Sequence, residues 1–267
     1  MRRKMLFSSA LSLEFRSEFD MSYRPAIAAM GPEEICALAP SGVLRVAINM
    51  ANFLLVSERT LDGGPAGVSP DMAAAIASNL GLRCEFVPYA NPGLVADAAS
   101  QDAWDIALIG AEPQRAETIA FTPAYAEIEA TYMVPAGSRF HRLEDVDSSG
   151  ARIVVAERTA YGLWLDRHIR SAELVRVNGL DGSLNVFRAG GYDALAGLRP
   201  GLISAVKEIE GARVLEGRFM AVKQAVGVPR NKAAATGWLT AFVEAARTDG
   251  FVEMLIAKYG IDGLTVA

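Results

Sequence analysis

One arginine gives the clearest chemical signal in the sequence. Arg115 follows a nearly all-apolar run at 105–110, a composition typical of a strand that is buried on both faces of a parallel sheet. Open α/β sheets bind ligands at the carboxyl ends of their strands. An arginine at that edge can hold a carboxylate through two parallel hydrogen bonds. The position therefore indicates an anion-binding arginine or, as the simpler alternative, a surface arginine in an ion pair.

Residues for metal or nucleophilic chemistry are scarce. The two histidines, His141 and His168, do not stand three or four residues from each other or from a cysteine, so no metal site is predicted. Cys36 and Cys84 are expected to be unpaired thiols. No G-x-S-x-G elbow, P-loop or G-x-G-x-x-G motif occurs, so hydrolases and nucleotide binders gain no support. We expect no cofactor.

The composition is that of a soluble globular protein. The 267 residues are 51% apolar and 21% charged, with a net charge of −5, and they suffice for one large domain or two lobes around a sizeable core. Beyond the first four residues the chain has no cluster of lysine and arginine, which argues against a nucleic-acid partner. No apolar run approaches the ~20 residues that cross a bilayer, so we expect no membrane insertion.

The start of the chain resembles a secretory signal only in part. A basic segment at 1–4 precedes an apolar one at 5–13, but Glu14 and Arg16 end it and no A-x-A-like cleavage site follows. This favours a cytoplasmic over a periplasmic location. We interpret 1–41 as a poorly ordered N-terminal extension with one short helix at 33–38, and either Met1 or Met21 can be the true start.

Alternating strand and helix patterns begin after Gly42. The helix predicted at 70–80 is the best defined, because Ser69 suits the N-cap, Pro70 the first turn, and Gly81 the end. The predicted strands are 43–48, 82–88, 105–110, 130–134, 152–156, 173–177 and 192–196, with extended segments at 218–222 and 224–228. The other predicted helices are 94–100, 159–169, 183–188, 233–247 and 251–259.

This order predicts an α/β protein with two lobes joined by a hinge. We assign 42–134 together with 223–267 to the first lobe and 135–222 to the second, because the strand and helix pattern restarts near residue 135. Small-molecule sites are common in a cleft between lobes. We therefore expect the ligand there.

Several short motifs resemble those of one known family. In chain order they are 42–47 (GVLRVA), 67–73 (GVSPDMA), 104–107 (WDIA), 113–115 (PQR), 121–125 (FTPAY), 191–194 (GYDA), 249–251 (DGF) and 258–260 (KYG). From residue 42 to about 260 the chain resembles family 3 of the bacterial extracellular solute-binding proteins, the binding components of polar amino-acid ABC transporters. Their fold is the type II periplasmic-binding-protein fold.

The resemblance implies a role for particular residues. Arg115 would hold the ligand carboxylate, and Thr159 and Ala160 would face the same anion from the start of a helix. Phe53 would form an aromatic wall, although it also suits a core position, and Thr159 also suits an ordinary helix cap. The predicted ligand-binding residues are Phe53, Gly110, Ala111, Glu112, Arg115, Thr159, Ala160 and Gly197.

Departures from the family pattern bear on the ligand. Gly197 stands where amino-acid binders of the family carry an acid that pairs with the ligand's ammonium group, so a standard α-amino acid is in doubt. Glu112, Glu127 or Glu129 could restore a cation site; alternatively Glu112 pairs with Arg115 and the other two are solvated. Arg199 and Gln224, near the expected hinge, are further candidates, and Arg158 replaces a common glycine.

Three functions remain open at this stage. The leading one is a monomeric solute-binding protein for a small carboxylate-containing metabolite, partnered by a membrane ABC permease. The second is an enzyme on the same fold that resembles cyclohexadienyl dehydratase, with Glu112 or Glu127 as general acid acting on prephenate or arogenate. The third is a ligand-sensing module that reports to a signalling partner.

Overall fold

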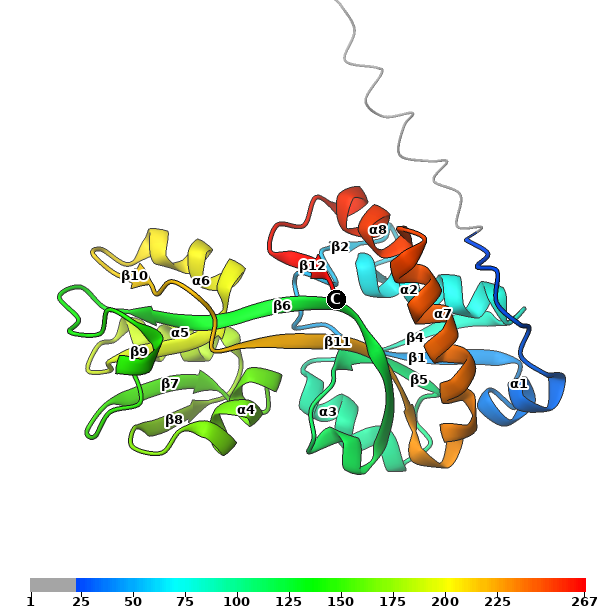
Figure 1. Cartoon of the computed structure of the whole chain (residues 1–267), viewed down its shortest axis with the longest axis horizontal. Helices are drawn as coiled ribbons and strands as arrows, with labels where there is room; N and C mark the ends of the chain where they lie inside the picture. Colours follow the sequence, from blue (N-terminus) through cyan, green and yellow to red (C-terminus); the bar gives the residue numbers. More distant parts are fainter. Residues whose placement is uncertain (1–22) are drawn as a thin grey trace, which may run out of the picture.

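A long mixed sheet runs through both halves of the molecule (Figure 1). A computed structural model describes residues 23–267. The strand order is β4-β1-β5-β11-β6-β9-β7-β8, with β10 and β12 also paired to β6. The strands of this sheet are β1 (Val43–Asn49), β4 (Arg83–Tyr89), β5 (Ile106–Gly110), β6 (Ile119–Val134), β7 (Arg152–Ala156), β8 (Glu173–Val177), β9 (Ala194–Leu198), β10 (Arg213–Val214), β11 (Met220–Pro229) and β12 (Leu264–Val266). A short separate pair, β2 (Glu58–Arg59) and β3 (Pro65–Ala66), lies in the loop after β1.

The first lobe is built on the parallel strands β4, β1 and β5. Every residue of β5 is buried, as its apolar composition predicts for a strand covered on both faces. One apolar cluster joins the sheet to α2 (Val68–Asn79), α7 (Thr236–Thr248) and α8 (Phe251–Tyr259). A second cluster, around Trp104, lies under α3 (Pro92–Asp97) and the 3-10 turn Ala98–Ser100.

The second lobe repeats this plan on β9, β7 and β8, which are also parallel. Its helices are α4 (Ala160–His168), α5 (Leu180–Arg188) and α6 (Arg199–Ala205). Two further apolar clusters cover the two faces of this part of the sheet. The expected α/β architecture with two lobes is therefore confirmed.

Two long strands connect the lobes. β6 and β11 run antiparallel and carry the sheet from one half to the other (Figure 1). Ile128 packs in the first lobe's core, whereas Ala130 packs in the second lobe's core. The change of core thus lies inside β6, before residue 134. The pairing of β6 with β11 shifts register on either side of Ala225, which is a local irregularity in the connection.

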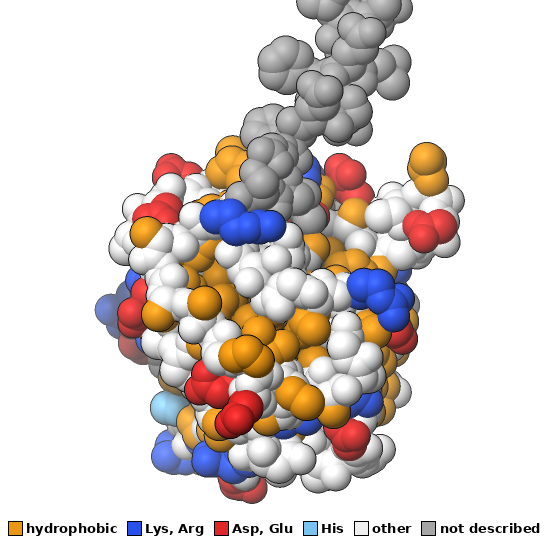
Figure 2. Space-filling view, turned by 90° about the vertical axis from the view of Figure 1, so that its right-hand side faces the viewer, with side chains coloured by type: hydrophobic (Ala, Val, Ile, Leu, Met, Phe, Trp, Pro, Cys, Tyr) orange, Lys and Arg blue, Asp and Glu red, His pale blue; other side chains and the backbone are white. Residues whose placement is uncertain are grey.

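The N-terminal extension is packed from Tyr23 onward. The Tyr23 ring stacks on Phe251 at 4.2 Å between centroids, and Leu38 at the end of α1 (Pro32–Leu38) is buried in the first core. This differs from the expected poor order, because apolar residues of the segment find partners on α7 and α8. Figure 2 looks onto this end of the molecule, where apolar side chains lie between acidic and basic ones. Residues 1–22, with both the signal-like segment and Met21, lie outside the described residues.

Some element boundaries differ from the sequence prediction. α2 begins at Val68 after an N-cap at Gly67, not after Ser69. The Ser69 hydroxyl instead shares a buried 2.8 Å hydrogen bond with the Tyr125 hydroxyl. Gly67 has φ +142°, and a Cβ there would lie 2.5 Å from the Leu55 carbonyl oxygen, so glycine is required by space as well as by conformation.

The described residues contain few special chemical groups. Cys36 and Cys84 are free thiols, as predicted. Within residues 23–267 no group of three or more metal-ligating side chains comes together. In the same range, no helix is long and apolar enough to cross a membrane.

Candidate functional site: a cavity between the lobes

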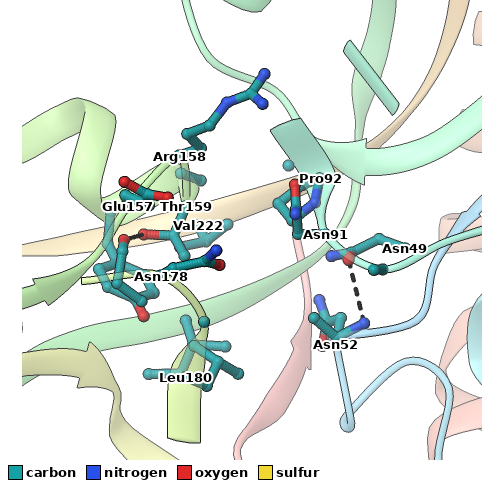
Figure 3. Close-up of a pocket in the computed structure, with 18 of the residues that line it drawn as sticks. Asn49, Asn52, Asn91, Pro92, Glu157, Arg158, Thr159, Asn178, Leu180 and Val222 are labelled. Atoms are coloured by element: carbon teal, nitrogen blue, oxygen red, sulfur yellow. Dashed lines mark hydrogen bonds between the residues drawn. The ribbon is translucent and has the colours of Figure 1, made fainter. Parts of the chain in front are cut away.

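A cavity of about 310 Å³ lies between the two lobes. Its walls come from the carboxyl ends of β1, β4 and β5 in the first lobe and of β7 and β8 in the second, the edge at which α/β sheets bind ligands. In Figure 3, Asn49, Asn52 and Asn91 lie on one side of the cavity, and Thr159 and Asn178 face them from the other. Both lobes thus contribute polar groups to one cavity.

Arg115 is a buried cation at this cavity. It follows β5 in the 3-10 turn Arg115–Glu117, and only 4% of it is exposed. Its guanidinium donates to the Gly110 carbonyl oxygen at 2.6 Å and to the Arg158 carbonyl oxygen at 3.0 Å. Burial lowers the pKa of Arg115 to about 10, against the opposing effect of the Glu112 carboxylate, so the side chain is a cation at neutral pH.

The Arg115 guanidinium has binding capacity to spare. Of its five N–H donors, these two bonds use two. Within the described part of the chain no carboxylate oxygen lies within ion-pair distance of it. A buried charge without a direct ion pair is costly, and an anion that binds Arg115 in the cavity would reduce that cost.

Asn52 is a second group without a partner. It is 8% exposed, it lines the cavity, and its Oδ1 has no hydrogen-bond donor among the described residues. A buried acceptor left without a donor costs free energy. A ligand N–H or O–H at this side of the cavity would satisfy it.

The start of α4 faces the cavity, but the Thr159 hydroxyl is committed to the helix. Thr159 is the N-cap: its Oγ1 accepts from the Gly162 N–H at 3.1 Å and donates to the Ala156 carbonyl oxygen at 2.8 Å. Thr159 therefore acts as a helix cap at the cavity wall. The first N–H groups of a helix have no intrahelical acceptor, so Ala160 can still offer its backbone donor to an anion.

Arg158 adopts a left-handed conformation directly before this cap. Its φ is +60°, which is unfavourable for a residue with a Cβ. Its guanidinium donates across the lobes to the Gly93 carbonyl oxygen at 2.9 Å and to Asp97 Oδ1 at 2.6 Å. These bonds compensate for the unfavourable backbone conformation of Arg158. The positive φ also explains why glycine would suit this position.

Glu112 takes part in another contact between the lobes. Its carboxylate, 5% exposed, pairs at 2.5 Å with Arg167 on α4 and not with Arg115. Together with the bonds of Arg115 and Arg158, this ion pair holds the two lobes against each other. The two lobes are therefore in direct contact in the described conformation.

The sequence-predicted site residues fall into three groups. Gly110, Arg115, Thr159 and Ala160 line the cavity between the lobes, and Gln224, a further candidate, does so as well. Phe53 and Gly197 instead line a second, smaller cavity. Ala111 and Glu112 line neither cavity.

The other acidic candidates are engaged elsewhere. Both lie on the connecting strand β6, where Glu129 pairs with Arg199 at 2.8 Å and Glu127 lies 3.9 Å from Arg218. The carboxylate that does line the cavity is that of the exposed Glu157, which sequence reasoning missed.

Sequence reasoning also missed the asparagines. Asn49 ends β1, Asn91 follows β4 and caps α3, and Asn178 follows β8. Each comes within three residues of the carboxyl end of a predicted strand, and that position was the available signal.

The comparisons with known proteins agree with this architecture. Residues 44–262 match the model of the bacterial extracellular solute-binding proteins, family 3. The chain belongs to this family. As a family 3 solute-binding protein, it has structural relatives that are mostly binding proteins for amino acids.

Three relatives illustrate the range. The L-cysteine solute receptor of Neisseria gonorrhoeae superimposes with a TM-score of 0.71 at 17% identity, over 87% of this chain and 99% of that one. An amino-acid ABC transporter substrate-binding protein of Streptococcus pneumoniae Canada MDR_19A, bound to L-arginine, gives 0.68 at 21% identity, over 88% and 99%. Cyclohexadienyl dehydratase of Pseudomonas aeruginosa is 35% identical over 119 residues, which are 43% of this solute-binding protein and 44% of the dehydratase.

Proposed function

We propose that this solute-binding protein captures a small carboxylate between its lobes, with Arg115 as the group that holds the carboxylate, and delivers it to a membrane ABC permease. The observation that carries the proposal is the buried Arg115 guanidinium at the cavity, with unused donors and no carboxylate within ion-pair distance among the described residues. A bidentate carboxylate would use those donors and compensate the charge.

The proposal includes closure of the two lobes on the ligand, by bending of the two connecting strands. We place the hinge where β6 and β11 pass from one core to the other, near 128–130 and 222–226, close to the boundaries first assigned at 134/135 and 222/223. Because one chain supplies both walls of the cavity, the proposal requires only a monomer.

The test is ligand-dependent thermal unfolding with a panel of amino acids, dicarboxylates, aromatic acids and other monocarboxylates. A ligand at 100 times its Kd stabilises the folded protein by about 2.7 kcal/mol. For a protein of this size the midpoint should rise by roughly 5–10 °C. Arg115→Ala should abolish the rise, whereas Arg83→Ala, a change at an exposed arginine on β4, should preserve it. Equal binding of every carboxylate by Arg115→Ala and the parent would refute the role of Arg115.

A second candidate function is catalysis like that of the dehydratase relative, favoured by the 35% identity to cyclohexadienyl dehydratase. Glu112 and Glu127, the acids first considered, are ion-paired outside the cavity, so Glu157 is the acid placed to act there. Prephenate and arogenate should then be consumed by the parent and not by Glu157→Gln. Folded parent protein that leaves both compounds intact would rule this candidate out.

A further inference from the structure

A second cavity, of about 210 Å³, lies inside the second lobe beside the first. It is lined mainly by α5, α6 and β9, and the two cavities share Tyr161, Leu180 and Leu198 as wall residues. In Figure 3, Leu180 lies on the side of the first cavity opposite Arg158. The smaller cavity therefore adjoins the space in which Arg115 would hold a carboxylate.

The walls of the second cavity are mostly apolar, with the exposed Asp181 as the charged residue among those that line it. Leu184, Leu195, Leu202 and Ala205 provide much of its surface. The buried Ser183 hydroxyl also lines it but is satisfied, because it donates to the Leu180 carbonyl oxygen at 2.7 Å. Gly197 adds no side chain, and its surroundings are tight on one side, since a Cβ there would lie 3.0 Å from Leu202 Cδ2. A mostly apolar cavity of this size can accept hydrocarbon, since an apolar cavity of about 150 Å³ holds a benzene ring.

Phe53 extends the wall from the other lobe. Its ring is carried by the loop after β1, and a Cβ on Gly201 in α6 would lie 3.2 Å from its Cζ. The ring is 43% exposed, so it covers the cavity at the surface without being part of a core. Contact between Phe53 and α6 joins the two lobes at the edge of the apolar space.

We infer that the second cavity is a subsite for the hydrocarbon part of the ligand, so that the solute is a monocarboxylate with an unbranched aliphatic or single-ring tail. The inference rests on the proposed role of Arg115. The carboxylate would remain in the first cavity, and the tail would pass Leu180 and Leu198 into the second.

A chain-length series of monocarboxylates tests this subsite. Titration calorimetry with the full chain would compare propanoate, butanoate, pentanoate, hexanoate and 3-phenylpropanoate. Each methylene that enters the apolar cavity should tighten binding by about fourfold, until the cavity is full. A flat series would overturn the inference.

Two variants locate the tail. Ala205→Leu adds carbon atoms inside the cavity and should end the gain at a shorter acid, while propanoate binds as before. Leu184→Ala enlarges the cavity and should extend the gain to a longer acid, which keeps the test valid if Ala205→Leu fails to fold. Ala189→Leu, at an exposed position at the end of α5, is the matched control. If affinity rises with the length of the acid in the same way in both cavity variants and in the parent, the tail binds elsewhere and the inference is overturned.

The same experiment separates the two proposals. If the parent protein binds no carboxylate, or if Arg115→Ala binds carboxylates as tightly as the parent does, the proposed function is contradicted. Arg115-dependent binding of propanoate without any effect of tail length contradicts the subsite alone.

Discussion

Asp105 connects three separate parts of the first lobe. Its fully buried carboxylate accepts from the Arg45 N–H at 2.8 Å, pairs with the Arg45 guanidinium at 2.7 Å, and accepts from Lys232 Nζ at 2.5 Å. β1, the start of β5 and the 3-10 segment Arg230–Ala235 are thus joined at one carboxylate. Its removal would leave two cations near each other with no equivalent partner.

We expect Asp105→Asn to lower the free energy of unfolding by about 3 kcal/mol or more, the range for breaking a buried ion pair. Asp102→Asn is the matched control, because Asp102 contacts the same two cations but its side chain is 68% exposed. That change should cost less than about 1 kcal/mol. Urea unfolding of the two variants measures the difference, and equal costs would contradict this account.

A substitution at Asn52 should have the opposite effect to one at Asp105: it should lower the affinity for the ligand and leave the free energy of unfolding almost unchanged. Asn52→Leu replaces a buried amide, whose Oδ1 has no donor among the described residues, by an apolar group of similar size. Since the unsatisfied acceptor is removed, the free energy of unfolding without ligand should stay level or rise by about 1 kcal/mol. Ligand affinity should fall roughly tenfold, the equivalent of one lost hydrogen bond. Unchanged affinity in calorimetry would show that the ligand does not use this acceptor.

At the scale of elements, Asp147 fixes the turn that follows α4. Its carboxylate accepts from three backbone N–H groups, those of Arg170, Ser171 and Ala172, at 2.9, 2.7 and 2.9 Å. Burial opposes ionisation, but these three donors outweigh it and lower the pKa of Asp147. The carboxylate thereby links the segment before β7 to the segment before β8.

The lowered pKa predicts how this contribution depends on pH. Because the folded-state pKa lies below the unfolded value of about 3.9, Asp147 stabilises the fold above that value. The contribution is lost as pH falls through the lower, folded-state pKa. We expect Asp147→Asn to cost about 1 kcal/mol between roughly pH 5 and 8, a modest figure because the carboxylate is half-buried, and much less at about pH 3. Unfolding free energies measured over this range check it, and a cost that grows on acidification would contradict it.

Elements with a strong local pattern could be predicted from the sequence. β7, β8 and α8 have the predicted ends, because each is a short run of uniform periodicity between turn residues. Residues 119–129 of β6 were not predicted, since Pro123 and mixed polar residues interrupt the pattern and only pairing with β11 defines this part of the strand. α6 was also missed, because its opening Arg-Pro-Gly suggests a turn.

The candidate site, like the fold, could be predicted from the sequence only in part. Arg115 and Gly110 lie where the buried strand predicted them, because that strand determines its own carboxyl end. Phe53 and Glu112 lie elsewhere, since the path of a loop depends on the opposite lobe. The role of Arg167 as the partner of Glu112 has no local signal at all, because the two residues are 55 positions apart.

At the scale of the whole molecule, the Glu112–Arg167 pair favours the closed arrangement of the lobes. Glu112→Gln should weaken ligand binding by about fivefold, since a partly exposed pair contributes on the order of 1 kcal/mol. The variant should also shift small-angle scattering toward a larger radius of gyration in the absence of ligand.

The control for this prediction is Asp166→Asn, which breaks a pair with Arg176 inside the second lobe. It should leave both the radius and the affinity unchanged. A double-mutant cycle with Arg167→Met adds a further requirement, because paired residues should show non-additive effects on affinity. Additive effects would mean that the pair does not act in closure.

The strand order also sets the sequence in which the molecule can assemble during synthesis. β7, β8 and β9, together with the end of β6 that pairs with β9, are all made before β11 leaves the ribosome. The first lobe, although its strands come earlier in the chain, needs β11 beside β5 and the late helices α7 and α8 over its core. The second lobe can therefore complete its sheet first, while β5 still presents an unpaired edge. During synthesis that edge, like the edge of β6 that also pairs with β11, needs protection from other unfolded strands.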